Sequence, residues 1–429
     1  MSSYCLRTST TTTATADGDV TGESAVEPPD FAINKSKLEN RCHVERQSEN
    51  RNNTFDDDDD DERYKATGQA SRFGIQPRCM PLTRFILGDS RTDNNLAQLM
   101  SSMLTAIKAI TATVRKAGFA KLYGHYGTTN VHGDIVQHMD MVANELIVNL
   151  LKSCPQTCAL VSEESQQPIQ VTANENGKYI VAFDPLDGSC NIDCHGTIGT
   201  IFAIWEKRSK CDRGASDSDM LQCGRKLVAA GYAVYGSATM VVLTTGHGVN
   251  GFTLDPSVGA FILSHPNIRI PPRGNIYATN ESNKRHYTAG VREYMRAINY
   301  PENDHAPMNL RYVGSFIADL HRTLLYGGLY FYPPLRDKNG KLTNGKLRLM
   351  YECNPLSMVI EQAGGMASDG RIPVLDIRPE TIHDRAPIFV GSNENVREIL
   401  AFVQKHDHRP TGAASVEQQE PAQSQHLSH

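Results

Sequence analysis

Residues Tyr179 to Gly188 read YIVAFDPLDG, an apolar run of strand type followed at once by an acidic turn. Pro185 fixes one φ angle and forces a bend directly after the apolar run. A turn of this kind can aim the carboxylates of Asp184 and Asp187, together with the Leu186 carbonyl, at one point, and the glycine that follows leaves space beside it. Alone, such a turn is a common surface loop, so its meaning depends on the other acidic residues.

Acidic residues also follow or end other elements of the chain, at Asp134, Glu163-Glu164 and Glu352. Burying several carboxylates together is prohibitive unless cations neutralise them, and oxygen ligands of this type suit Mg²⁺. Glu163 and Glu164 come directly after the expected strand 159–162. Because successive side chains on a strand point to opposite faces, we expect one glutamate to bridge metals and the other to act as a base for water.

Two cationic segments complete the candidate site. From Lys346 to Glu352 the sequence KLRLMYE alternates, so a strand would place Lys346, Arg348 and Glu352 on one face. The segment 311–315, RYVGS, opens an expected helix whose free N–H groups favour anions. Two anion sites beside one metal cluster fit a substrate with two phosphates.

The pattern of elements predicts an α/β or α+β layered enzyme. Helices are expected from Leu96 to Val114, with Asp93 or Asn94 as the cap, and over 139–150, 291–298, 317–325 and 355–363. Strands are expected at 159–162, 179–183, 200–205, 227–235, 240–244, 252–254 and 260–263. Residues 1–78 and the tail 409–429 are polar and are predicted to be disordered.

Composition excludes several classes of function. The chain is 39% hydrophobic and 21% charged, and its net charge of −5 owes much to the acidic run Asp56–Glu62. The remainder carries no basic stripe, so we expect no nucleic-acid partner. No apolar run reaches the roughly 20 residues that span a bilayer, so we expect no membrane association. The ten cysteines form no close CxxC pair, which favours a reducing compartment.

The chain resembles the class I fructose-1,6-bisphosphatases from about Leu82 to Lys405. The motifs that carry the resemblance are LTRF at 82–85, LYG at 122–124, TTNVHGD at 128–134, LVSEE at 160–164, FDPLDGSCNID at 183–193, LVAAGYAVYGSATM at 227–240, RYVGS at 311–315 and GKLRLMYECNP at 345–355. Several of these also mark the wider lithium-sensitive phosphatase superfamily, and RYVGS and LYECNP narrow the match to the fructose enzyme.

The resemblance implies magnesium-dependent hydrolysis of the 1-phosphate of fructose 1,6-bisphosphate, with two or three Mg²⁺ per subunit and Mn²⁺ as a substitute. It implies a layered α-β-α-β-α fold with a regulatory half over 79–268 and a sugar-binding half over 269–408, assembled as a homotetramer. The cytoplasm is favoured over a plastid as the location. The alternatives are a sedoheptulose-1,7-bisphosphatase, a dual-specificity enzyme, and an inactive metabolite-sensing scaffold.

Residue roles follow from the same resemblance. The implied metal ligands are Asp134, Glu163, Asp184, the Leu186 carbonyl, Asp187 and Glu352. Asp134 and Glu164 would position and deprotonate water, and Asp140 would support the Asp134 loop. The implied substrate-binding residues are Asp187, Gly188, Ser189, Cys190, Asn280, Asn283, Arg311, Tyr312, Gly314, Phe316, Tyr332, Lys346 and Arg348, with Arg311 reaching a neighbouring subunit.

The chain departs from the family pattern in three places. Cys190 stands where a second serine is usual, and four extra residues separate Tyr332 from Lys346. In the AMP site of mammalian members, Lys178-Tyr179 is present as a remnant, but Ala97 replaces a threonine and Glu206 replaces an arginine. Because an acidic residue repels a nucleotide phosphate, we expect weak or altered AMP binding. Cys211 and Cys223 flank a loop without the cysteine-bearing insertion of plastid relatives, so we expect unpaired thiols there, with a thiol-dependent switch as the alternative.

Overall fold

The structure, a computed structural model, describes residues 80–88, 92–117, 125–129, 135–172, 177–209, 214–302 and 306–407. For 125–129 and 135–137 it describes the backbone alone. The predicted disordered segments, the Asp134 loop and Cys211 lie outside the described residues.

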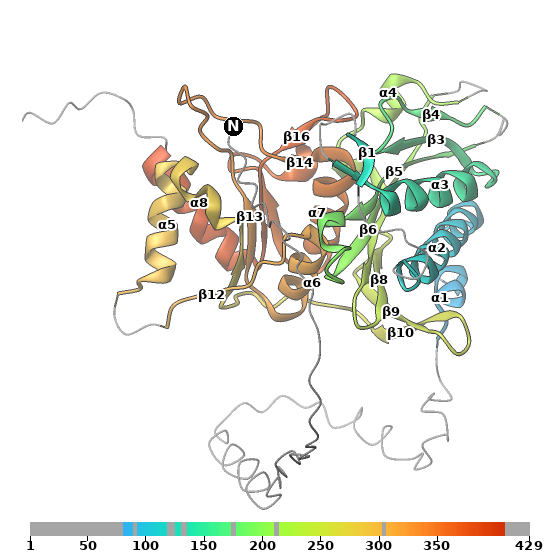
Figure 1. The fold of residues 1–429 in the computed structure, drawn as a ribbon, viewed down its shortest axis with the longest axis horizontal. Coiled ribbons are helices and arrows are strands. Elements are labelled where there is room, and N and C mark those ends of the chain that lie inside the picture. The colour runs from blue at the N-terminus through green and yellow to red at the C-terminus, as the bar shows by residue number, and fades with distance from the viewer. Residues whose placement is uncertain are drawn as a thin grey trace, which may run out of the picture. The chain divides into compact units, whose positions relative to one another are not determined.

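Three helices form the first layer, coloured blue to green in Figure 1. They are α1 (Leu82–Gly88), α2 (Asn94–Val114) and α3 (His138–Lys152). The prediction for α2 is confirmed, cap included, because the Leu96 N–H donates to Asp93 Oδ1 at 2.6 Å. The apolar stripe of each helix faces the neighbouring sheet, as the shared core of these residues shows.

The second layer is an eight-stranded sheet with the order β10-β9-β8-β7-β6-β5-β3-β4. All neighbouring strands are antiparallel except β3 and β5, which are parallel. The strands are β3 (Thr157–Ser162), β4 (Ile169–Gln170), β5 (Tyr179–Asp187), β6 (Ile198–Glu206), β7 (Leu227–Tyr235), β8 (Thr239–Thr244), β9 (Asn250–Asp255) and β10 (Ala260–His265). Every strand predicted between residues 159 and 263 is present, and β5 runs four residues further than predicted, through Asp187.

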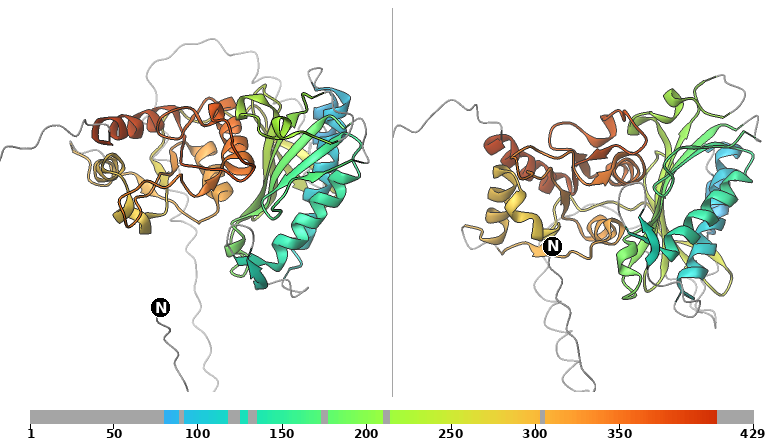
Figure 2. Two further views of the ribbon diagram at one scale, coloured as in Figure 1. Left: turned by 90° about the horizontal axis from the view of Figure 1, so that it is seen from above. Right: turned by 45° about the horizontal axis from the view of Figure 1, so that its top comes forward.

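Two helices, α6 (Phe316–Tyr326) and α7 (Asn354–Gln362), lie between this sheet and a five-stranded one (Figure 2). The smaller sheet has the order β12-β11-β13-β17-β15. Its strands are β11 (Ile276–Ala278), β12 (Asn309–Leu310), β13 (Leu329–Tyr332), β15 (Met366–Ser368) and β17 (Ile388–Gly391). The helices α5 (Ala289–Asn299) and α8 (Asn393–Asp407) pack together on its far side. The predicted order of layers, α-β-α-β-α, is thereby confirmed.

Short elements connect these layers. They include the pairs β1 (His125–Thr129) with β2 (Ile135–Gln137) and β14 (Leu347–Arg348) with β16 (Arg385–Ala386), and the helix α4 (Asp217–Met220). Among the described residues, no helix combines the length and the apolar character needed to cross a membrane.

The predicted strand from Lys346 to Glu352 is wrong. Only Leu347 and Arg348 are in a strand, and Leu349–Cys353 form a π-helical turn that continues into α7. All residues from 347 to 353 are buried, Arg348 and Met350 included. The alternation therefore does not separate an inner from an outer face, which was the assumption behind the prediction.

Candidate active site

The acidic turn lies inside strand β5, where the pairing with β6 becomes irregular. Asp184 pairs with Ile201 and Asp187 with Gly199, so the β5 side holds one extra residue. A bulge of this kind bends a strand and redirects its side chains. The Leu186 N–H donates to Asp184 Oδ1 at 2.9 Å, which fixes that side chain within the bend. The expected bend is present, as a bulge rather than as the end of the strand.

Hydroxyl groups hold the same bend from the neighbouring strands. Thr200 Oγ1 donates to the Pro185 carbonyl at 2.8 Å, and lies 2.7 Å from the Tyr235 hydroxyl. Thr200 is on β6 and Tyr235 is on β7, so three adjacent strands share one buried chain of hydrogen bonds.

Three buried carboxylates converge at this bend. Asp184, Asp187 and Glu352 each offer an oxygen atom, and these atoms lie within 4.8 Å of one another. Glu352 comes from the π-helical turn Leu349–Cys353 after β14, which is far from β5 in the sequence. The predicted convergence of these three residues is confirmed.

The electrostatics of the cluster favour a bound cation. Burial raises the pKa of Asp184 well above its ordinary value, and Glu163, Asp187 and Glu352 raise it further. Burial and the proximity of Glu163 also raise the pKa of Glu352. Negative charges packed this closely cannot all persist without a counter-ion. The donors are all carboxylate oxygens, so the residues present fit a hard divalent ion such as Mg²⁺ rather than a soft one.

Glu163 and Glu164 occupy a turn after β3 rather than the strand itself. The Glu163 N–H donates to the Phe183 carbonyl at 3.2 Å, which ties this turn to β5, and the Glu164 N–H donates to Ser162 Oγ at 3.2 Å. The argument from alternating strand faces is therefore wrong, because a turn has no such alternation. Glu163 nevertheless lies against the cluster, since it shares a hydrogen bond with Asp184.

The start of helix α6 binds Asp187. Ser315 Oγ donates to Asp187 Oδ2 at 2.6 Å, and the N–H groups of Phe316 and Ile317 donate to the same carboxylate at 3.2 and 2.9 Å. The N–H groups of residues 313 and 314 donate to Asp319. The expectation of free N–H groups for a phosphate is therefore wrong, because the protein's own carboxylates satisfy them.

Gly188 makes the close approach of β5 and α6 possible. Its φ is +76°, and a Cβ atom placed there would lie 2.5 Å from the Cβ of Ser315. After it, Ser189–Asn191 form a 3₁₀ turn in which Cys190 is exposed. Burial and Asp187 raise the pKa of the Cys190 thiol, and Lys346 opposes them. Lys346 thus lies near both the turn and the carboxylate cluster.

The residues expected to bind the sugar form a second group. Asn280 Nδ2 donates to the Tyr332 hydroxyl at 3.5 Å, and Tyr332 shares a hydrogen bond with Tyr312. Asn283 is half-buried, and its N–H donates to the Asn280 carbonyl at 3.1 Å. Three segments of the smaller sheet and its loops therefore bring these hydroxyl and amide groups together.

The two arginines of the predicted site differ in exposure. Arg311 is exposed, and its guanidinium donates to the Leu310 carbonyl at 2.9 Å. Arg348 is buried, and its backbone N–H donates to Glu352 Oε2 at 2.5 Å. Arg348 therefore supports a carboxylate of the cluster from behind.

Asp140 is buried on α3, and Asp134 itself lies outside the described residues. The group formed by Asp319 and the pair formed by Tyr351 and His383 were not predicted from the sequence. A carboxylate four residues into a helix and a histidine in a late loop give no signal of their own, and both become visible only through the contacts that the fold creates.

The possible AMP remnant is occupied by a carboxylate of the chain. The Tyr179 hydroxyl donates to Asp93 Oδ1 at 2.9 Å, and Lys178 Nζ lies 3.8 Å from Asp93 Oδ2. Glu206 pairs with Tyr179 across β5 and β6. The N-cap residue of α2 therefore partners both members of the Lys178-Tyr179 pair.

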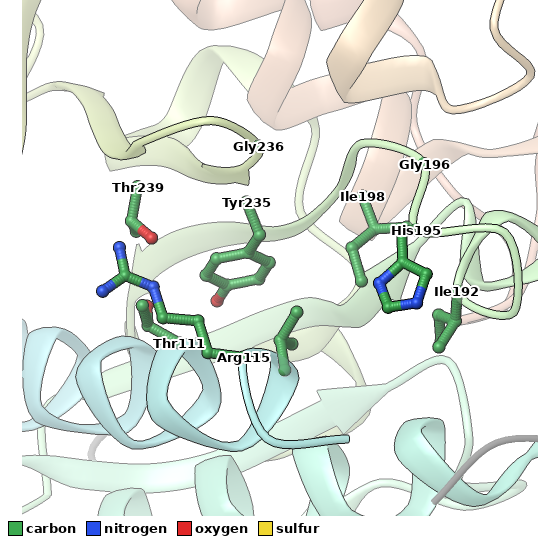
Figure 3. Close-up of a pocket in the computed structure, with 10 residues that line it drawn as sticks. Thr111, Arg115, Ile192, His195, Gly196, Ile198, Tyr235, Gly236 and Thr239 are labelled. Atoms are coloured by element: carbon green, nitrogen blue, oxygen red, sulfur yellow. The ribbon is translucent and has the colours of Figure 1, made fainter. Parts of the chain in front are cut away.

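A cavity of about 190 Å³ lies between the end of α2 and strands β6 and β7 (Figure 3). Its polar side chains come from Thr111, Arg115, His195, Tyr235 and Thr239. The cavity is separate from the carboxylate cluster, and the Tyr235 hydroxyl is the end of the hydrogen-bond chain that reaches Pro185.

Comparison with known proteins matches two family models to the chain, the fructose-1-6-bisphosphatase N-terminal domain over residues 80–266 and its C-terminal domain over residues 270–404. Fructose-1,6-bisphosphatase isozyme 2 of Rattus norvegicus is 51% identical over 330 residues, covering 76% of this chain and 96% of the relative. The cytosolic fructose-1,6-bisphosphatase of Solanum tuberosum is 47% identical over 326 residues, covering 75% and 94%. The crystal structure of Leishmania major fructose-1,6-bisphosphatase in holo form aligns with a TM-score of 0.71 at 38% identity, covering 76% of this chain and 99% of the other.

Proposed function

The chain belongs to the fructose-1,6-bisphosphatase family, and on that premise we propose that Asp184, Asp187 and Glu352 form its catalytic magnesium centre. The protein is an enzyme that hydrolyses fructose 1,6-bisphosphate to fructose 6-phosphate and phosphate, and its family depends on metal ions. The observation that carries the proposal is the convergence of three buried carboxylates within 4.8 Å.

The ligand set extends beyond these three residues. Glu163 and the Leu186 carbonyl complete the set that we propose for Mg²⁺, and Asp134 is added from the sequence resemblance. When bound, the metal ions neutralise the phosphate and lower the pKa of the attacking water. The contribution of the chain is to hold the carboxylates in place before substrate arrives, through Leu186, Ser315 and the start of α6.

The proton balance assigns roles to two more residues. Glu164, in the turn beside Glu163, accepts the proton of the attacking water, with Asp134 orienting that water. Asp140, buried on α3, supports the Asp134 loop. Water then attacks the 1-phosphorus in line with the sugar oxygen, which departs as an alkoxide and takes a proton from a second water.

Two groups of residues bind the substrate. Ser189, Cys190 and the Gly188 N–H face the 1-phosphate, while Asn280, Tyr312, Tyr332 and Lys346 bind the sugar and the 6-phosphate. The hydrogen bonds that link Asn280, Tyr332 and Tyr312 support this assignment, because they preorganise three polar groups on one wall. Arg311 is exposed, as a residue that reaches a neighbouring subunit must be.

The catalytic proposal is tested with Asp187→Asn and Glu352→Gln. Both variants should lose magnesium-dependent release of phosphate from fructose 1,6-bisphosphate by more than about a hundredfold, because each removes a charge from the metal centre. Calorimetric titration with Mn²⁺ provides a second readout that does not depend on turnover. Substantial activity together with unchanged Mn²⁺ affinity would show that the cluster is not the metal centre.

Regulation by AMP is proposed to be weak. Asp93 already neutralises Lys178 and binds the Tyr179 hydroxyl, and Glu206 adds a second negative charge beside them. An AMP phosphate would therefore have to displace a carboxylate. In Asp93→Asn, half-inhibition should occur at an AMP concentration about fivefold lower, the equivalent of roughly 1 kcal/mol of relieved repulsion. An unchanged AMP titration would contradict this account.

We further propose a homotetramer in the cytoplasm, with a regulatory half over 79–268 and a sugar-binding half over 269–408. The similarity to a relative named as cytosolic supports the location, and the assembly is proposed from the sequence resemblance. Sedimentation of the purified protein and microscopy of the tagged full chain test the two proposals.

A further inference from the structure

His383 lies between the two segments that carry Glu163 and Glu352. It belongs to the loop before β16, and its ring is half-buried. The Tyr351 hydroxyl lies 2.9 Å from His383 Nδ1, and His383 Nε2 lies 3.1 Å from the Ser165 carbonyl oxygen. The two nitrogens of one imidazole therefore contact two distant parts of the chain. Ser165 is 218 residues from His383 in the sequence, and Tyr351 is 32 residues from it.

The direction of both hydrogen bonds follows from chemistry. A backbone carbonyl can only accept, so His383 Nε2 must carry a proton and donate to Ser165. Burial lowers the pKa of His383, which favours the neutral ring. In the neutral ring Nδ1 has no proton, so it accepts from the Tyr351 hydroxyl. The link is thus a directed chain from Tyr351 through the ring to Ser165.

Each end of this chain is one or two residues from a carboxylate of the metal centre. Ser165 closes the turn that carries Glu163 and Glu164, because its N–H donates to the Ser162 carbonyl at 3.3 Å. Tyr351 is fully buried and precedes Glu352 in the π-helical turn. The bond between these turns is therefore well placed to set the distance between Glu163 and Glu352.

The loop that carries the ring is itself held firmly. The Leu349 N–H, at the start of the π-helical turn, donates to the Asp384 carbonyl at 2.7 Å. The Asp384 carboxylate accepts from the Glu380 N–H at 2.6 Å and from the Thr381 hydroxyl at 2.6 Å. A fixed loop can transmit positional restraint, whereas a mobile one could not.

We propose that His383 is a positioning residue that holds Glu163 and Glu352 at the separation the metal ions require, and thereby raises metal affinity. The inference rests on the proposed metal centre. Groups that orient metal ligands from behind typically change metal affinity by 10–100-fold when they are removed.

A second tyrosine–histidine pair supplies a matched control. The Tyr232 hydroxyl lies 2.8 Å from His321 Nδ1, and the two rings meet edge to face with centroids 5.8 Å apart. Tyr351 and His383 meet in the same way, with centroids 5.9 Å apart. His321 is the sixth residue of α6, and neither it nor Tyr232 adjoins a proposed metal ligand in the sequence. Substitution of His321 therefore measures the effect of losing a tyrosine–histidine hydrogen bond that does not join the turns carrying Glu163 and Glu352.

The experiment measures binding of Mn²⁺ alone to the full chain, by the electron paramagnetic resonance signal of free Mn²⁺. The variants are His383→Phe, Tyr351→Phe, the double variant and His321→Phe. We expect the Mn²⁺ dissociation constant to rise about tenfold in the first two. The double variant should show no further loss of Mn²⁺ affinity, because both substitutions break the same chain of hydrogen bonds. His321→Phe should bind Mn²⁺ as the wild type does.

A kinetic readout separates positioning from general damage. The Mg²⁺ concentration for half-maximal activity should rise with the Mn²⁺ constant, while kcat at saturating Mg²⁺ stays within about threefold of wild type. Wild-type Mn²⁺ affinity in His383→Phe or in Tyr351→Phe would overturn the inference, and so would an equal loss in His321→Phe. Should His383→Phe not fold, Tyr351→Phe decides alone. Failure of the wild type to bind Mn²⁺ would overturn the metal centre itself, and this inference with it.

Discussion

The contact between Ser315 and Asp187 joins the fold to the chemistry, so Ser315→Ala perturbs both. Ser315 is fully buried, its hydroxyl donates to Asp187 Oδ2 at 2.6 Å, and the same oxygen accepts from the Ala318 N–H at 3.2 Å. Loss of a hydrogen bond to a charged group costs about 1.5–3 kcal/mol. Loss of a helix N-cap costs about 1 kcal/mol. Because the two terms share one oxygen, we expect the free energy of unfolding to fall by roughly 2–4 kcal/mol.

The effect on function has a different origin. Asp187 keeps its bonds to the N–H groups of Phe316 and Ile317, so its carboxylate remains near the cluster but is less firmly oriented. We expect the Mg²⁺ concentration for half-maximal activity to rise about tenfold, within the range found when a partner of a metal ligand is removed. Urea unfolding and Mg²⁺ titration of phosphate release measure the two effects.

Ser216→Ala is the matched control. Ser216 caps α4, donates to Asp219 Oδ2 at 2.6 Å and accepts from the Asp219 N–H at 3.3 Å, so it makes the same two kinds of bond away from the cluster. This variant should lose stability while its Mg²⁺ response stays unchanged. The reasoning is refuted if Ser315→Ala keeps wild-type stability, or if both variants shift the Mg²⁺ response equally.

Three further predictions concern backbone strain, pH and metal. Gly188→Ala should lower the free energy of unfolding by roughly 2–4 kcal/mol, because a Cβ at φ +76° would lie 2.5 Å from the Ser315 Cβ, and thermal unfolding measures this. Burial, aided by His265 and Arg322, lowers the pKa of His321 from 6.5 to about 4. The folded state therefore binds this proton more weakly than the unfolded one, and up to roughly 3 kcal/mol of stability present above pH 6.5 is lost as the pH falls towards 4. His321→Phe should flatten that part of the pH–stability curve, and an equally steep curve would contradict the assignment. Finally, Mg²⁺ at about 100 times its dissociation constant should stabilise chelator-treated protein by roughly 2.7 kcal/mol, and an unchanged melting temperature would count against the metal centre.

The sequence was sufficient to predict the helices and strands whose apolar residues recur at helical or strand spacing. Strand β7, at Leu227–Tyr235, has the predicted bounds, and α2 has its predicted cap, because both depend on local pattern and local hydrogen bonds. It also placed Asp184, Asp187 and Glu352 together, although Glu352 is carried there by the packing of a helix between two sheets. That prediction succeeded because it rested on chemistry: carboxylates that follow apolar segments are buried at low cost only where they share a cation.

The wrong predictions for segments 311–315 and 346–352 have one physical cause. The sequence shows that a backbone donor is available or that residue types alternate, but it does not show which group will contact them. The RYVGS segment signals a helix start that will bind an anion, and a phosphate and Asp187 satisfy that signal equally well. Only the bulge in β5, produced by one extra residue opposite β6, brings Asp187 to the helix. The segment 346–352 fails similarly, because a segment buried on every side gives alternation no solvent face to report. The Tyr179 hydroxyl illustrates the same limit. The sequence offers it as a donor to a ligand, but in the structure it donates to the Asp93 carboxylate of the same chain. At such a site the free energy of displacing the internal carboxylate decides whether a ligand can bind, and Asp93→Asn tests this by removing the charge that an incoming phosphate would have to displace.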